Sequence, residues 1–188
     1  MLQLLLGTGF ILLDLNVQFG SNVLGLLPDT VGYLLLAAAI HRLGPLCPRL
    51  RKCELYVGVM IFYSLALYCF DLFGISAKIG VMGMLLSCIS CIYCFLILYQ
   101  CVRSLWELEQ QYGLHLKSNV LKLGWLIAAA GNLCTYAAAA IFPQGVTACT
   151  LAGGAGNIYF IINLYHAYRN FRASKPRIPP EVCALQDL

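Results

Sequence analysis

Charged side chains are scarce in this chain of 188 residues: twelve are basic and eight are acidic, which together make 11% of the sequence. A soluble domain carries about 25% charged residues and roughly 45–50% apolar ones, whereas 61% of this chain is hydrophobic. So few charges cannot coat a globule of 20.7 kDa, which excludes a water-soluble fold. Disorder is excluded too, because disordered chains are poor in apolar and aromatic residues. The composition therefore predicts a polytopic membrane protein.

Motifs for catalysis, metal binding and nucleotide binding are also missing. The sequence has no H-E-x-x-H, no G-x-S-x-G and no phosphate loop that ends in Lys-Ser/Thr. Cys88, Cys91 and Cys94 form two overlapping C-x-x-C pairs, and Cys101 follows in the same expected span, but they lie in an apolar run without the polar approach that reactive thiols need. We interpret Cys88, Cys91 and Cys94 as part of a small-residue packing seam, with thiol or copper chemistry as the alternative. We expect no catalytic residues, no metal site and no cofactor.

Long apolar runs are what the sequence has instead. About 20 apolar residues are needed for a helix to cross a hydrocarbon core about 30 Å thick. Six stretches qualify: residues 2–19, 23–41, 55–73, 79–102, 119–142 and 146–168. Helices are favoured because every backbone group in lipid needs a hydrogen-bond partner. We expect an all-α bundle of about six transmembrane helices in three hairpins, one domain over residues 1–168, followed by a mobile basic tail at 169–188.

The basic residues predict the orientation of this bundle. Eleven of the twelve fall on one side of a six-span topology, and Lys78 alone falls on the other. They are Arg42, Arg49, Arg51 and Lys52; Arg103, Lys117 and Lys122; and Arg169, Arg172, Lys175 and Arg177. By the positive-inside rule both termini are cytoplasmic. We expect these cations to interact with anionic headgroups of the lipid bilayer. Nucleic-acid binding is not expected, because the cations form three short clusters between apolar runs and do not line one face of a soluble element.

Three acidic residues lie in or near the ends of the expected spans that face away from the basic clusters. Asp14 and Asp29 are each about seven residues from the tip of the first hairpin, and Asp71 is near the end of the third span. Carboxylates that converge either share a proton or bind a cation, so the three are candidates for a cation or proton site. The alternative is that Asp29, after Pro28, caps a helix that starts late, and that Asp14 and Asp71 lie at the water-exposed ends of their spans.

Four further polar residues lie within the last two spans: Asn132, Asn157, Asn163 and His166. Asparagine in a helix bundle usually forms hydrogen bonds between helices, which is the first interpretation of these side chains. A polar path from the aspartates to His166 is the alternative. The run Ala152–Gly156 is rich in small residues and predicts a face of close helix contact.

The segment Leu27-Pro-Asp-Thr-Val-Gly-Tyr33, with Asp14-Leu-Asn16 upstream, resembles the first hairpin of uncharacterised small membrane proteins from clostridia-like bacteria. Those proteins carry a similar D-I-L-P-D-x-x-G-Y stretch. The resemblance covers roughly residues 10–45, and Leu24-Gly25-Leu26 stands here where an additional acid is usual. The resemblance implies a multi-pass protein of the bacterial cytoplasmic membrane, and it does not indicate any activity.

Three hypotheses for function follow. The first is a small transport or channel-like protein for a cation or a proton-coupled solute, which uses Asp14, Asp29 and Asp71. The second is a non-catalytic scaffold or subunit whose small-residue seams bind a membrane protein partner or a second copy of the chain. The third is an intramembrane enzyme that acts on lipid, which the missing motifs disfavour. The first requires the aspartates to converge on a cavity.

Overall fold

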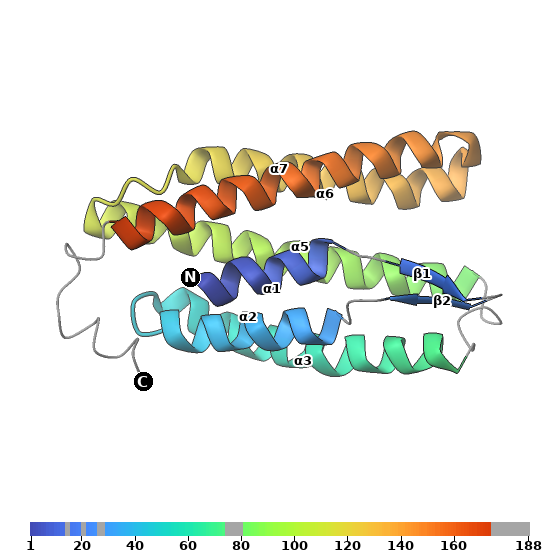
Figure 1. Ribbon diagram of the computed structural model, residues 1–188, viewed down its shortest axis with the longest axis horizontal. Helices are drawn as coiled ribbons and strands as arrows, with labels where there is room; N and C mark the ends of the chain where they lie inside the picture. Colours follow the sequence, from blue (N-terminus) through green and yellow to red (C-terminus); the bar gives the residue numbers. More distant parts are fainter. Residues whose placement is uncertain (14–15, 20–21, 26–28, 74–80, 174–188) are drawn as a thin grey trace.

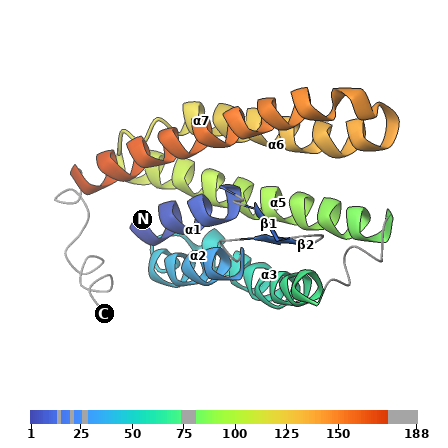
Figure 2. The same cartoon turned by 45° about the vertical axis from the view of Figure 1, so that its right-hand side comes forward.

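The computed structural model describes residues 1–13, 16–19, 22–25, 29–73 and 81–173, and these form an elongated helical bundle with one short β-hairpin (Figure 1; Figure 2). The elements are α1 (Leu2–Leu12), β1 (Asn16–Phe19), β2 (Asn22–Gly25), α2 (Asp29–Leu43), α3 (Pro48–Leu72), α5 (Val81–Tyr112), α6 (Ser118–Ile141) and α7 (Val146–Ala173). A 3₁₀ turn at Pro143–Gly145 joins α6 to α7. The helical fold expected from the sequence is confirmed for the long helices, whereas the expectation of an all-α chain is wrong at β1 and β2.

Four segments of the described chain are long and apolar enough to cross a membrane. They are Pro48–Phe70, Met82–Tyr112, Ser118–Ile141 and Pro143–Ala173. Large apolar side chains are exposed along them, with Leu55 at 74%, Phe62 at 76% and Leu151 at 70% of their full accessible surface. Lipid tails solvate such side chains as well as the protein interior does. These properties are those of a multi-pass membrane protein.

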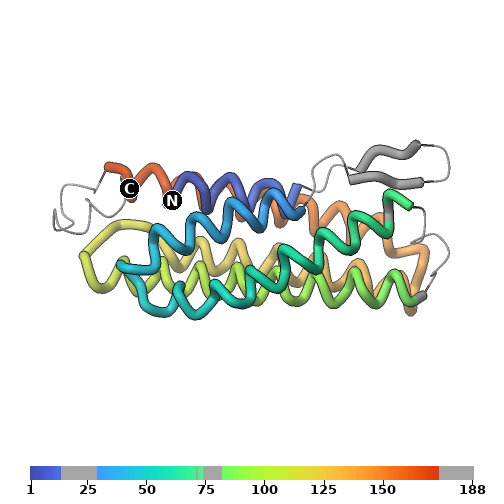
Figure 3. The backbone as a smooth tube through the Cα atoms, turned by 90° about the horizontal axis from the view of Figure 1, so that it is seen from below, coloured from blue at the N-terminus to red at the C-terminus, as the bar shows by residue number. Residues whose placement is uncertain are grey.

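The first hairpin differs from the two full-length spans expected at 2–19 and 23–41. α1 has 11 residues and α2 has 15, so they are about 16 and 22 Å long. α1 ends and α2 begins about halfway along the longer helices (Figure 3). Beyond them the chain continues as the antiparallel pair β1–β2, with Val17 opposite Leu24, and β2 packs against α3.

The sequence of this region explains why its helices are short. Between α1 and α2 it contains two glycines, two asparagines and two valines, all of which are weak helix formers. Pro28 disfavours the helical conformation in the residue before it, which favours a helix start at or after this position. The expectation of a continuous second span from residue 23 is therefore wrong, and α2 starts at Asp29.

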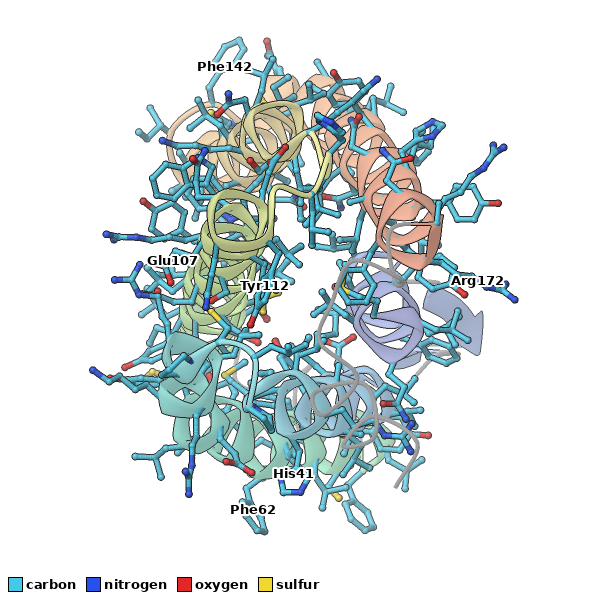
Figure 4. The ribbon with its side chains drawn as sticks, turned by 90° about the vertical axis from the view of Figure 1, so that its left-hand side faces the viewer. His41, Phe62, Glu107, Tyr112, Phe142 and Arg172 are labelled. Carbon is cyan, nitrogen blue, oxygen red and sulfur yellow. The ribbon has the colours of Figure 1, made fainter. Side chains whose placement is uncertain are left out.

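The basic clusters of the described chain meet at one end of the bundle. Arg49, in the first turn of α3, forms an ion pair with Glu107 near the end of α5. At the same end, the Asn170 side chain near the end of α7 donates a hydrogen bond of 2.9 Å to the His115 carbonyl. Figure 4 looks onto this end, which carries the labelled His41, Glu107 and Arg172. We call it the basic end.

The last cluster lies partly in a helix, where the sequence suggested a mobile tail. α7 continues to Ala173, so Arg169 and Arg172 belong to its final turns. Cations near a helix C-terminus are favoured by the helix dipole and by the unpaired carbonyls there. The rest of the expected tail lies outside the described residues.

Small residues bring pairs of helices into close contact. A Cβ atom added at Gly131 of α6 would lie 2.7 Å from the Gly153 Cα of α7, and one at Gly156 would lie 2.9 Å from the Ala128 Cα. The close-contact face predicted at Ala152–Gly156 is confirmed. A second seam joins the short helices, since a Cβ at Gly7 would lie 2.7 Å from the Gly32 carbonyl oxygen.

Candidate functional site

The first turn of α2 holds a partly buried carboxylate near a buried tyrosine of the same helix and a buried thiol of α5. Asp29 is the first residue of the helix and is about half-buried. One turn further on, the Tyr33 side chain is 1% exposed and its hydroxyl contacts the Cys94 thiol of α5. The Asp29 carboxylate lies within electrostatic range of both groups. A carboxylate in this position also interacts favourably with the free amides and the dipole of the helix.

A second polar contact links the same turn of α2 to α3. The Thr30 and Ser64 hydroxyls are 3.1 Å apart, and the Ser64 hydroxyl also donates to the Ile61 carbonyl at 3.1 Å. Ser64 is 5% exposed, so this hydrogen bond is shielded from the surroundings. The first turn of α2 is therefore held by polar contacts to α3 and α5 at once.

These contacts lie near the middle of the apolar part of α5. The uncharged run Met82–Val102 of α5 has 21 residues and is about 31 Å long, which matches the hydrocarbon thickness of a bilayer. Cys94 lies eight residues from one end of this run and twelve from the other. Because Tyr33 contacts Cys94, the start of α2 lies near the middle of the bundle's apolar depth.

Two of the predicted amides form a second polar cluster, at the end of α1. The Asn132 side chain of α6 donates a 2.8 Å hydrogen bond to the Asn157 side-chain oxygen of α7. Asn157, which is 8% exposed, in turn donates to the Leu12 carbonyl at 3.2 Å. The expectation that asparagines in this bundle join helices is met by this pair.

The other two predicted polar residues do not join this cluster. Asn163 donates to the Tyr159 carbonyl of its own helix at 2.8 Å. His166 is exposed on α7, where its ring lies 6.1 Å from that of Tyr165. A continuous polar path to His166, one of the two interpretations of the sequence, therefore finds no support in these contacts.

Two members of the proposed aspartate cluster cannot be placed. Asp14 lies outside the described residues, and Asp71 lies in the last turn of α3 with its side chain outside the described part. Asp29 is thus the one candidate carboxylate whose surroundings are described.

Three of the four cysteines of α5, namely Cys91, Cys94 and Cys101, pack in or against the main apolar core. Cys94 and Cys101 are 6% and 4% exposed and belong to the main apolar core. Within the described ranges the cysteines are free thiols, and no three His, Cys, Asp or Glu side chains there are grouped as a metal site requires. Their surroundings fit packing between helices.

Sequence reasoning did not find three of these contacts. Thr30 and Tyr33 belong to the stretch Leu27–Tyr33 that carries the resemblance, but nothing in it indicates which residues of α3 and α5 they contact, and Ser64 lies in an apolar run without a motif. The hydrogen bond from Asn157 to Leu12 links residues 145 positions apart, so no local pattern reveals it. The sequence does contain one signal for this region, because Pro28-Asp29-Thr30 is typical of a helix N-terminus and so indicates that a helix starts near Asp29.

Comparison of the chain with protein-family models, with curated proteins and with solved structures finds no match.

Proposed function

We propose that this protein is a small transport or channel-like membrane protein for a cation or a proton-coupled solute, and that Asp29 is its central acidic group. The observation that supports this most is the interruption of the first hairpin at mid-depth. Non-helical backbone at membrane depth is tolerated where it is buried in protein or lines a water-filled cavity. Transporters place ion and substrate sites at such interruptions, near the middle of the membrane.

The interruption brings together groups that suit a cation. Carbonyls at the end of a half-helix are known cation ligands in transporters, and the carbonyls of α1 that follow Gly9, whose own carbonyl accepts from the Leu13 amide, have no partner within the helix. One of them, at Leu12, accepts the hydrogen bond from Asn157. The carboxylate of Asp29 begins α2, and Asp14 and Asp71 are proposed to complete the acidic set from the neighbouring segments.

The proposed topology has both termini in the cytoplasm of a bacterial cell and six crossings of its cytoplasmic membrane. In this arrangement the basic end faces the cytoplasm. The first two crossings each combine a short helix with a strand, namely α1 with β1 and β2 with α2. The acidic site then lies between mid-membrane and the outer surface.

The scaffold hypothesis is the weaker alternative for a specific reason. It requires small-residue seams that bind a partner helix in lipid. The seam at Gly131, Gly153 and Gly156 joins α6 to α7, and that at Gly7 and Gly32 joins α1 to α2, so both are occupied within the chain.

Flux measurements in vesicles test the proposal. Purified protein is reconstituted into liposomes that contain a pH-sensitive dye or a potassium- or sodium-sensitive dye, and flux is started by an ion gradient. We expect wild-type flux well above that of empty vesicles, and flux near the empty-vesicle level for Asp29→Asn, since asparagine keeps the helix cap but removes the charge.

Glu54→Gln is the matched control, because Glu54 is an exposed acid at the basic end that pairs with His41 at 3.5 Å. It should leave flux unchanged. Wild-type flux equal to that of empty vesicles for protons, sodium and potassium alike would contradict the proposal, as would full flux in Asp29→Asn.

A further inference from the structure

A groove runs between α3 and α5 on the outer surface of the bundle. Its volume is about 340 Å³, within the usual range of about 300–1,000 Å³ for ligand pockets. It is lined by Cys53, Tyr56, Tyr93, Leu96, Ile97 and Gln100. Tyr56, Tyr93 and Leu96 are 55%, 45% and 53% exposed, so the groove is open to the lipid-facing surroundings of two candidate membrane spans.

Two cations lie just beyond the end of the groove that is nearer the basic end. Lys52 precedes Tyr56 by one helical turn, and such neighbours share a face of the helix. On α5, Tyr93, Leu96, Gln100 and Arg103 are spaced by three, four and three residues, so Arg103 continues the stripe that lines the groove. Both cations are exposed.

The antiparallel register places these two cations at the same depth. The ion pair between Arg49 and Glu107 fixes the level of α3 against α5 at the basic end. Lys52 lies three residues further into α3, about 4.5 Å, and Arg103 four residues further along α5, about 6 Å. Arg103 also directly follows the uncharged run Met82–Val102, so the pair is at the expected boundary of the hydrocarbon core.

Neither cation is neutralised by the described part of the chain. The ion pairs there involve Arg49 with Glu107 and His41 with Glu54, and neither Lys52 nor Arg103 takes part in one. An exposed pair of cations above an apolar groove at the membrane boundary complements a phosphate above an acyl chain. Gln100, one turn below Arg103, is at the depth where the polar glycerol ester region of such a lipid would lie.

We propose that the α3–α5 groove binds one anionic glycerophospholipid of the bilayer. Its phosphate lies between Lys52 and Arg103, and one acyl chain lies along Tyr56, Tyr93 and Leu96. The site is separate from the acidic site around Asp29, and it does not depend on whether the protein transports anything.

Native mass spectrometry of the lipid-depleted protein in detergent tests this site. The protein is titrated with palmitoyl-oleoyl phosphatidylglycerol and, in parallel, with the zwitterionic phosphatidylcholine of the same chains. We expect one molecule of phosphatidylglycerol to bind more tightly than the rest and more tightly than phosphatidylcholine. In the variant Lys52→Gln/Arg103→Gln this affinity should fall by about 25-fold, since each cation near a membrane surface contributes about fivefold.

The matched control is Lys122→Gln/Arg172→Gln, which removes two exposed cations of α6 and α7 from the same end of the bundle. It should keep the tight site. Equal loss in both double variants, or equal binding of the two lipids by the wild type, would overturn the proposal.

A second pair of variants tests the groove itself without changing any charge. Leu96→Trp fills the groove, whereas Leu85→Trp places the same ring on α5 at a residue of similar exposure, 51% against 53%, that does not line it. We expect tight phosphatidylglycerol binding to be lost in the first variant and kept in the second. Identical phosphatidylglycerol binding in the two variants would contradict the proposal that the acyl chain lies in the groove.

Discussion

The side-chain amide of Asn157 on α7 donates a 3.2 Å hydrogen bond to the backbone carbonyl of Leu12, the last residue of α1. The last carbonyls of a helix have no partner within the helix, and at membrane depth such groups need another donor. The contact therefore stabilises the end of α1 inside the bundle and fixes a helix of only 11 residues against α7. Asn132, which donates to the Asn157 oxygen at 2.8 Å, holds the orientation of this amide.

Replacing Asn157 with alanine should destabilise the bundle. The change removes two hydrogen bonds between elements and leaves the Leu12 carbonyl without this donor, so we expect a loss of about 1–2 kcal/mol in the free energy of unfolding. Asn163→Ala removes an amide that bonds only within its own helix and should cost much less. Thermal unfolding in detergent, followed by circular dichroism, compares the two variants. Equal losses of stability in the two variants would show that the hydrogen bond to Leu12 contributes no more than a bond within α7.

Alanine at Gly156 should weaken the contact between α6 and α7. The added methyl group would lie 2.9 Å from the Ala128 Cα, which is backbone and cannot rotate away, so we expect a cost of about 1–3 kcal/mol from overpacking. At Gly154 an added Cβ meets nothing within 4 Å, and Gly154→Ala should be neutral or stabilise by up to about 1 kcal/mol through helix propensity. The melting temperature should therefore fall in Gly156→Ala and stay the same or rise in Gly154→Ala. An equal fall in both variants would contradict the close contact of α6 and α7 at Gly156.

Alanine at Glu109 should loosen the start of α6. The Glu109 carboxylate accepts hydrogen bonds from the Lys117 and Ser118 backbone amides at 3.2 and 3.0 Å and from the Ser118 hydroxyl. It thus caps α6 from the neighbouring helix, and loss of a cap costs about 0.5–2 kcal/mol. Hydrogen exchange of a peptide that covers Ser118–Leu121 should become faster in Glu109→Ala. Gln110→Ala, at an exposed neighbouring position, should leave it unchanged.

Single added cysteines test the proposed orientation. Gln144 lies in the turn between α6 and α7, and Arg51 lies at the basic end; both are exposed. In intact bacterial cells a membrane-impermeant maleimide should modify Gln144→Cys above the background of the unmodified chain, and Arg51→Cys only after the cells are permeabilised. The reverse pattern would invert the topology, and labelling of both in intact cells would rule out a single orientation.

The connection between α5 and α6 shows which features a local sequence pattern predicts and which it does not. The leucine spacing in residues 103–118 predicts a short interfacial helix that extends the span expected at 79–102 and is loosened at Gly113. α5 does continue past residue 102, to Tyr112, and Gly113 follows with φ 61°. Apolar periodicity and a glycine in the left-handed region are local properties, so they can be read from neighbouring residues alone. The partner of this segment is not local, because Glu109 reaches the Lys117 and Ser118 amides only after the chain has turned.

The sequence by itself determined that the protein is a helical membrane protein with its cations gathered at one end. Composition, apolar length and the spacing of basic residues are additive properties of the chain and need no tertiary information. Tertiary structure decided where the first hairpin is interrupted and which polar residues meet there. Asn157 could bond within its own helix, as Asn163 does, and it reaches Leu12 instead because glycines at 131, 153 and 156 bring α6 and α7 together beside the end of a short α1. Such a contact depends on the relative placement of three helices, which no single segment of sequence encodes.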